Sequence, residues 1–234
     1  MKTQAVHPTK IKQKQTMAER ANTLRAGVLG ANDGILTVVG VLFSVAAATT
    51  DHFTIFIAGL ADLLACAFSM ASGEYASVSS QKDTEQAVVD EESRKLTADY
   101  ASEFQAVVQH YVDRGVTQAT SEKIAKQLMD QDALGTVINV KYQLQLGHYM
   151  NPWDAAFSSL VAAASGGIFP LMAMTFLPGT WAWPGTIIAV VLTSCLTGFL
   201  SAKFGDGLVK TAVIRNVIIG IITMAIHYGI GQLM

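Results

Sequence analysis

The sequence predicts an all-α integral membrane protein with five transmembrane helices and a helical insert between the second and third of them. The first observation is composition: 51% of the 234 residues are hydrophobic, 15% are charged, and the mean hydropathy is +0.36. A soluble domain usually carries about 25% charged residues. The second is segregation, because the charges cluster in the N-terminal tail and in residues 80–150. Together they indicate a membrane protein with one soluble insertion.

Five apolar stretches approach the ~20 residues that a helix needs to cross the hydrocarbon core. They lie at about 26–48, 53–77, 154–177, 183–204 and 211–230. The expected order is a basic cytosolic tail, two transmembrane helices, a cytosolic helical insert and three further transmembrane helices, at 1–25, 26–79, 80–151 and 152–234. The second stretch is amphipathic at its end, which allows its helix to continue into water.

Lysine and arginine predict the orientation. Six precede the first span and seven lie in residues 80–150, whereas residues 49–52 and 178–183 contain none. The positive-inside rule therefore predicts a cytoplasmic N-terminus and an external C-terminus. The tail from about residue 13 to residue 25 is expected to form a basic amphipathic helix on anionic lipid. No cleavable signal peptide is recognised. The low charge of the outer face and the lack of targeting segments fit a bacterial plasma membrane, with an organellar membrane as the alternative. No nucleic-acid partner is expected.

The insert has a helical pattern of apolar residues interrupted by turn signals. Asp90 with Arg94, and Glu91 with Lys95, are four apart and are expected to pair. Gly115 suits the end of one helix, and two residues later a threonine suits the start of the next.

The second apolar stretch contains a stripe of polar and sulfur-bearing residues. Each step of four residues advances a helix by ~400°, a drift of only ~40°, so the stripe keeps to one side. A carboxylate at the centre of a bilayer helix costs roughly 2.5–3.5 kcal/mol, which makes an ion or proton pathway the default interpretation. Mixed oxygen and sulfur ligands suit Fe²⁺ or a similar ion. The alternative for Cys66 and Met70 is that they merely fill space in the apolar core, as these residue types often do. The stripe comprises Asp62, Cys66, Met70 and Glu74.

The first apolar stretch has a face of small residues, Gly27, Gly30, Ala31 and Gly34. Such a face allows close approach of another helix. Asp33 beside it is expected to face a helix or a cavity and not lipid. A purely structural role for Asp33, as a helix cap or as a hydrogen-bond acceptor between helices, is the alternative.

Three motifs resemble the vacuolar iron transporter family, which includes bacterial and nodulin-like members. They are Gly-Ala-Asn-Asp-Gly at 30–34, Ala-Phe-Ser-Met-Ala-Ser-Gly-Glu-Tyr at 67–75, and Ser-Gly-Gly-Ile-Phe-Pro at 165–170. The resemblance covers nearly the whole chain. It implies a homodimer that exports Fe²⁺, and often Mn²⁺, from the cytoplasm against an inward flow of H⁺, without a prosthetic group. It also implies that Asp33, Asp62 and Met70 line the metal path.

The resemblance further implies a cytosolic cluster of glutamates that collects metal. Glu92 and Glu103 fall on acidic positions of that cluster. Lys95, Ala106 and Gln143 stand where glutamates are expected, so the cluster is depleted in this chain.

Spacing alone suggests a related surface. Glu85, Glu92, Asp99 and Glu103 are seven, seven and four apart, which would place them on one helical face. That face is interpreted either as a weak site for divalent ions or as a solvated surface.

Three functions are therefore compared. The first is a proton-coupled exporter of divalent metal, in which Glu74 and the insert acids receive the ion. The second is a membrane-anchored iron-binding or ferroxidase-type protein that uses the acidic insert, although the Glu-x-x-His pattern of di-iron sites is missing from the sequence. The third is a scaffold without transport, which would have no need of a polar stripe in the membrane.

Overall fold

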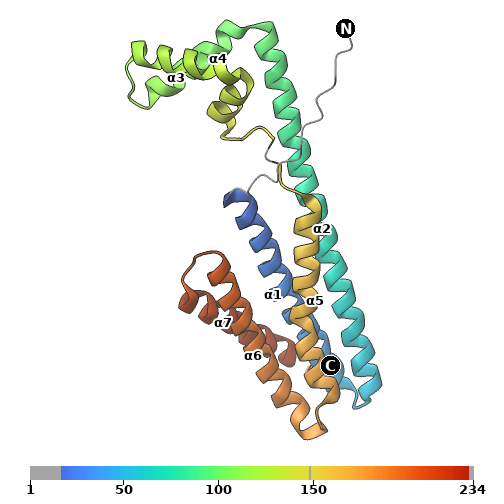
Figure 1. The fold of residues 1–234 in the computed structure, drawn as a ribbon. Coiled ribbons are helices and arrows are strands. Elements are labelled where there is room, and N and C mark those ends of the chain that lie inside the picture. Colours follow the sequence, from blue (N-terminus) through green and yellow to red (C-terminus); the bar gives the residue numbers. More distant parts are fainter. Residues whose placement is uncertain (1–16, 148, 232–234) are drawn as a thin grey trace, which may run out of the picture.

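The computed structural model describes residues 17–147 and 149–231, and its helices are named here in chain order (Figure 1). The sequence prediction of an all-helical membrane protein is confirmed, since five helices among the described residues are long and apolar enough to span a bilayer: α1, α2, α5, α6 and α7. The tail helix expected from residue 13 lies partly outside the described residues. The helices are α1 (Met17–Ala48), α2 (His52–Ala98), α3 (Tyr100–Asp113), α4 (Gln118–Tyr142), α5 (Pro152–Phe176), α6 (Gly179–Phe204) and α7 (Val209–Gly231).

Helix α1 is the centre of the membrane region. It packs against α2, α5, α6 and α7, while α6 and α7 pack against each other (Figure 1). The main apolar core gathers on one half of α1, where five of its side chains are at most 3% exposed, and it draws residues from all the other membrane helices. These α1 residues are Ile35, Val38, Val39, Leu42 and Phe43.

Glycines bring α1 and α5 into backbone contact. A Cβ added at Gly34 would lie 2.1 Å from the Ala163 carbonyl oxygen, and one at Gly166 would lie 2.3 Å from the Ala31 carbonyl oxygen. Only hydrogen fits at either position. The small face predicted on the first span is thus confirmed as the surface that receives α5, and it leaves the neighbouring Asp33 to face α2.

Helix α2 is much longer than a bilayer crossing. Its 47 residues extend ~70 Å, against ~30 Å for the hydrocarbon core. The helix continues without a break through residues 79 and 80, where the sequence analysis placed the start of the insert. Its far end meets α3 and α4 well away from the other membrane helices (Figure 1). The end of the membrane region nearest these helices is called the insert side below.

The insert has an apolar core of its own, formed mainly by α3 and α4. Helix α3 is followed by Gly115 at φ +87°, and Thr117 precedes α4, as the turn signals predicted. Helix α4 is bent at Asp132, whose φ of −153° is not helical and whose carboxylate accepts a hydrogen bond from the Gly135 amide. Asp132 therefore starts the second half of α4 as a cap would.

Candidate functional site

Two of the predicted residues meet between α1 and α2. The Cys66 thiol donates a hydrogen bond to the Asp33 carboxylate, with 3.3 Å between Sγ and Oδ2. Cys66 is buried and Asp33 is half-buried. The aspartate faces a neighbouring helix, as expected, and its partner, a thiol, is a weak hydrogen-bond donor.

A second carboxylate, that of Asp62, lies on α2 one helical turn before Cys66. Asp62 is next to Thr37 of α1 and interacts electrostatically with Asp33. Its Oδ2 and the Thr37 Oγ1 are both buried and make no hydrogen bond of ordinary geometry among the described residues, although the two side chains are close enough to interact. A buried acceptor left unsatisfied costs roughly 1–3 kcal/mol, and more when it is charged. A proton or a bound cation would remove that cost.

The contacts between the two helices follow one antiparallel register. A step of four residues along α1 is matched by a step of four back along α2, so Thr37 is beside Asp62 and Asp33 is beside Cys66. Two further turns towards the insert side, Arg25 meets Glu74. We call this row the α1/α2 seam. Sequence reasoning found the α2 half of the seam and Asp33 of its α1 half. It missed Arg25 and Thr37, although their spacing from Asp33 carries the same period of four.

The thioether of the stripe lies between these pairs. Met70 is half-buried and packs on Cys66, Ala67 and Ala163. It is one turn from Cys66 and one turn from Glu74, so it belongs to the α2 row of the seam. This placement is compatible with both roles that the sequence suggested for Met70, core filling and metal ligation.

A guanidinium closes the insert-side end of the seam. Glu74 is buried, and its Oε2 lies 3.4 Å from Nη2 of Arg25. Arg25 also donates to the Asn22 side chain through Nε and Nη2, at 3.2 Å and 3.1 Å. The Arg25 side chain is 52% exposed. A cation that approaches Glu74 from this side therefore competes with a charge already in place.

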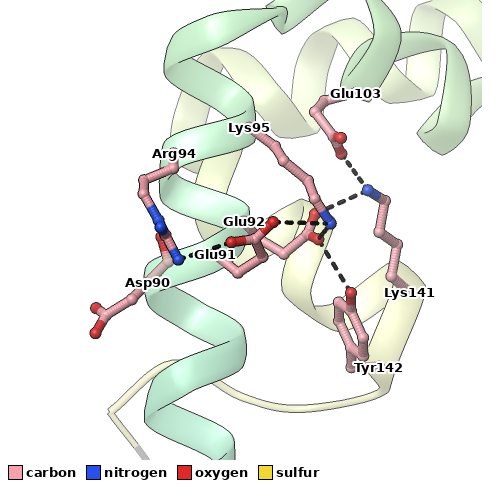
Figure 2. A network of polar contacts seen from close by, with 8 residues as sticks. All are labelled: Asp90, Glu91, Glu92, Arg94, Lys95, Glu103, Lys141 and Tyr142. Carbon is pink, nitrogen blue, oxygen red and sulfur yellow. Dashed lines mark hydrogen bonds and ion pairs between the residues drawn. The ribbon is translucent and has the colours of Figure 1, made fainter.

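The acids of the insert are arranged differently. Glu92 is fully buried, and Figure 2 shows Lys95, Lys141 and Tyr142 converging on it, at 2.8, 2.8 and 3.0 Å. Lys141 also forms an ion pair with Glu103. Burial raises the pKa of the Glu92 carboxyl, but hydrogen bonds from Lys141, Lys95 and Tyr142 outweigh burial and bring it to about 2. We call this group the Lys141 network.

The prediction of one helical face that carries four acids was wrong, because α2 ends before Asp99. The backbone of Asp99 is not helical, and its side chain accepts a hydrogen bond from the Ser102 amide as the N-cap of α3. Glu85 shares a side of α2 with Glu92, as predicted, but lies two turns (~10 Å) away from it and accepts a hydrogen bond from Gln81. The structure thus joins Glu92 to Glu103 through Lys141 and leaves Glu85 and Asp99 apart.

Three positions carry another residue where the family resemblance predicts a glutamate, and the structure shows where each of these residues lies. Lys95 pairs with Glu91 and Glu92, Ala106 is half-buried on α3, and Gln143 ends α4 with a left-handed φ of 58°. The described residues contain no group of three or more His, Cys, Asp or Glu side chains placed to hold a metal ion.

Of the two ion pairs predicted within α2, one is observed as expected. Lys95 lies 3.7 Å from Glu91. Arg94 was predicted to pair with the Asp90 carboxylate, but it pairs with Glu91 at 2.7 Å and reaches Asp90 only through a backbone carbonyl (Figure 2). The pairing with Glu91, three residues away, is also a neighbour contact on a helix.

Carboxylates held at a seam between spanning helices define a multi-pass membrane protein with polar groups inside the membrane. Comparison with known proteins identifies the kind more closely: the profile of the VIT family matches residues 24–232, and the chain belongs to that family. A protein of Acanthamoeba castellanii named vacuolar iron transporter is 34% identical over 223 residues, 95% of this chain and 82% of that protein. Vacuolar iron transporter homolog 1 of Arabidopsis thaliana is 30% identical, over 92% of this chain and 85% of its own length. Vacuolar iron transporter homolog 2.1 of the same plant is 28% identical, over 97% and 88%.

Proposed function

We propose that this protein is a secondary transporter that exports Fe²⁺, Mn²⁺ or both from the cytoplasm in exchange for protons. The proposal rests on membership of the VIT family and on relatives named vacuolar iron transporters. The observation that carries it within this chain is the α1/α2 seam, where Asp33 and Asp62 are held inside the membrane region with replaceable or missing hydrogen-bond partners.

The ligand chemistry supports a divalent transition metal. Carboxylate oxygens bind hard cations, whereas thiol and thioether sulfur favour softer ones, and Fe²⁺ and Mn²⁺ accept oxygen-rich mixed sets. Asp33, Cys66 and Met70 offer such a mixture within one row. Na⁺ and K⁺ gain nothing from the sulfurs.

Coupling to protons follows from the cost of the carboxylates. A carboxylate inside a membrane is penalised as long as it is charged, and either a proton or a metal ion neutralises it. The two therefore compete for Asp33 and Asp62. Protons that enter from the outer side would displace the metal outward. The emptied seam would then be neutral while the transporter returns to its cytoplasm-facing state.

The route into the seam begins at Glu74. A metal ion that arrives from the insert side displaces Arg25 from the Glu74 carboxylate, then loses water as it passes Met70 to reach Asp33. The guanidinium is exposed and has an Asn22 partner to retain, so it can move aside without becoming unpaired.

A homodimer would complete the metal site. One chain places few ligand atoms at any point of the seam, and the described residues of a single copy form no cluster of three ligand side chains of the His, Cys, Asp or Glu type. Two copies of Asp33 and Met70 across a two-fold axis give four ligand residues for one ion. Closed two-fold symmetry is the commonest arrangement of homo-oligomers.

The proposed orientation places the insert in the cytoplasm, with the C-terminus outside, because lysine and arginine are concentrated on the insert side. We propose a bacterial plasma membrane. The names of the relatives refer to a vacuole, and in either membrane this orientation removes metal from the cytoplasm.

The alternative, a ferroxidase-type site in the insert, has less support. Such a site needs acids free to share an iron ion. Glu92 and Glu103 instead share the ammonium group of Lys141.

The test is metal flux into proteoliposomes under an imposed pH gradient, with Fe²⁺ (kept reduced) and Mn²⁺ measured separately. Asp33→Asn should reduce gradient-dependent flux to the level of empty liposomes, because it removes the charge that both ions neutralise. Asp154→Asn is the matched control, since Asp154 is exposed in the first turn of α5. Normal flux in Asp33→Asn, or metal that binds without crossing, would favour the binding or ferroxidase function.

A further inference from the structure

A groove of about 480 Å³ opens between α1, α5 and α6 in the insert-side half of the membrane region. Its lining residues run from Arg20 to Ala31 on α1, from Ser158 to Phe169 on α5, and from Thr193 to Phe204 on α6. Each stretch advances eleven residues, ~16 Å along a helix. One leaflet of the hydrocarbon core is ~15 Å deep. The groove therefore has the depth of one leaflet.

The walls of the groove are apolar. Glycine, alanine, valine, leucine and phenylalanine make up most of the lining. Three of the hydroxyls among them already donate to backbone carbonyls: Thr23 to Glu19 at 3.1 Å, Ser158 to Thr23 at 3.2 Å and Thr193 to Ala189 at 2.7 Å. A polar solute would find few hydrogen-bond partners in the groove, whereas a hydrocarbon chain gives up no hydrogen bond on entering.

The mouth of the groove is basic. Arg20 is exposed, and its Nη2 donates to the carbonyl of Phe204 at the end of α6, 2.9 Å away. This bond uses one of the five N–H donors of the guanidinium. Lys203, next in the chain to Phe204, lies with its Nζ 5.7 Å from the centre of the Phe199 ring. Arg20 thus lines the groove itself, whereas Lys203 lies beside the groove, next to the lining residue Phe204.

We propose that this groove binds one anionic glycerophospholipid of the insert-side leaflet, with an acyl chain along α1, α5 and α6 and the phosphate at Arg20 and Lys203. The site lies on the opposite side of α1 from the residues that face α2, and the inference does not depend on the transported ion. A basic residue at an anionic membrane surface contributes ~1 kcal/mol, a factor of about five in affinity.

A second copy of this chain fits the groove less well. In a membrane dimer with its axis along the bilayer normal, residues at the same depth meet each other. Arg20 and Lys203 of the two copies would then gather at the same depth, where like charges repel. A zwitterionic lipid brings a cation of its own to the same mouth, so the charge pattern favours a lipid of net negative charge.

The experiment is native mass spectrometry of the full-length protein, stripped of lipid and titrated with phosphatidylglycerol or phosphatidylcholine of identical acyl chains. The wild type should bind phosphatidylglycerol more tightly. Arg20→Gln and Lys203→Gln should each weaken that preference about fivefold. Lys210→Gln removes an equal charge from α7, outside the groove lining, and should leave the preference unchanged.

A groove-filling variant separates the chain site from simple surface attraction. Ala162→Phe places a ring in the groove and should abolish binding of both lipids while the protein stays folded and keeps its oligomeric mass. The proposal is overturned if the wild type binds both lipids equally, or if Arg20→Gln behaves like Lys210→Gln. It is also overturned if Ala162→Phe changes only the oligomeric mass, which would identify the occupant as a second copy. Should Ala162→Phe fail to fold, the two charge variants decide.

Discussion

Buried carboxylates occur in two regions of this molecule, and their surroundings are opposite. In the Lys141 network, both oxygens of Glu92 accept hydrogen bonds from Lys95, Lys141 and Tyr142. In the α1/α2 seam, Asp62 Oδ2 has no partner among the described residues and Asp33 accepts only a thiol. The insert is the less apolar environment, yet it holds the better satisfied acid.

The difference separates a structural charge from an exchangeable one. A buried ion pair with every lone pair satisfied fixes the groups that form it, and breaking it is costly. A carboxylate without a fixed cation is free to be neutralised by a proton or by a metal ion. We therefore expect the Lys141 network to contribute stability and the α1/α2 seam to exchange ions. Four predictions test this expectation.

Removing the shared ammonium should have the largest effect on stability. Lys141→Met leaves Glu92 and Glu103 buried without their common cation. Breaking a buried pair costs roughly 3–5 kcal/mol, and we expect about 3 kcal/mol because a quarter of the Lys141 side chain is exposed. Hydrogen exchange of the α3 and α4 amides measures the loss. Lys126→Met, at an exposed position of α4, is the control, and equal protection in the two variants would refute the structural role.

Acid should remove the contribution of Glu92. Its folded pKa of about 2 lies below its ordinary value of 4.5. The unfolded chain therefore takes up a proton before the folded chain does as the pH falls, and stability is lost between 4.5 and about 2. The thermal stability of the wild type relative to Glu92→Gln should be constant above that window and decrease within it. A difference that stays constant down to the lower limit would contradict the assignment.

Separating α1 from α5 should disturb the seam without touching its polar groups. In Gly34→Ala the new Cβ meets the Ala163 carbonyl oxygen, which is backbone and cannot rotate away. Overpacking of this kind costs roughly 1–3 kcal/mol. Gly73→Ala is the matched control, because nothing lies within 4 Å of its added Cβ and alanine favours helix. Similar unfolding temperatures for the two variants would show that the helices adjust freely.

Opening the insert-side end of the seam should have the smallest effect. Exposed ion pairs contribute roughly 0.2–1 kcal/mol, and the Arg25 side chain is 52% exposed. Arg25→Gln frees Glu74 from its competitor, so the apparent KM for metal should fall, by roughly two- to fivefold, with kcat little changed. Arg94→Gln, on the insert, controls for the loss of a positive charge. An increase in KM would mean that Arg25 orients Glu74 for metal and does not compete with it.

The fold was predictable from the sequence to the extent that hydropathy controls it. Five long apolar stretches require five spanning helices because a bilayer satisfies no backbone hydrogen bonds. Gly30 and Gly34 beside Asp33 predicted a close helix contact, and α5 supplies it. The helix break at Asp99 was missed, since an aspartate within a helical pattern gives no sign of whether it continues one helix or caps the next.

The candidate site was half predictable. A period of four shows which residues of α2 share a side, but not which helix faces them, so Thr37 and Arg25 were absent from the predicted site. Glu92 and Glu103 were expected to attract metal because their acidity is visible in the sequence. Lys141 is 49 residues from Glu92 along the chain, and only folding brings its ammonium group between them.

The sequence by itself determined the membrane class, the number of spans, the position of the insert and the identity of the acids inside the membrane. These depend on composition and on short-range periodicity, which each segment carries alone. The tertiary structure decided which acids are paired. Pairing depends on the register between helices that are distant in the chain. In this protein that register leaves Asp33 and Asp62 without a cationic partner among the described residues, while it closes the insert around Lys141.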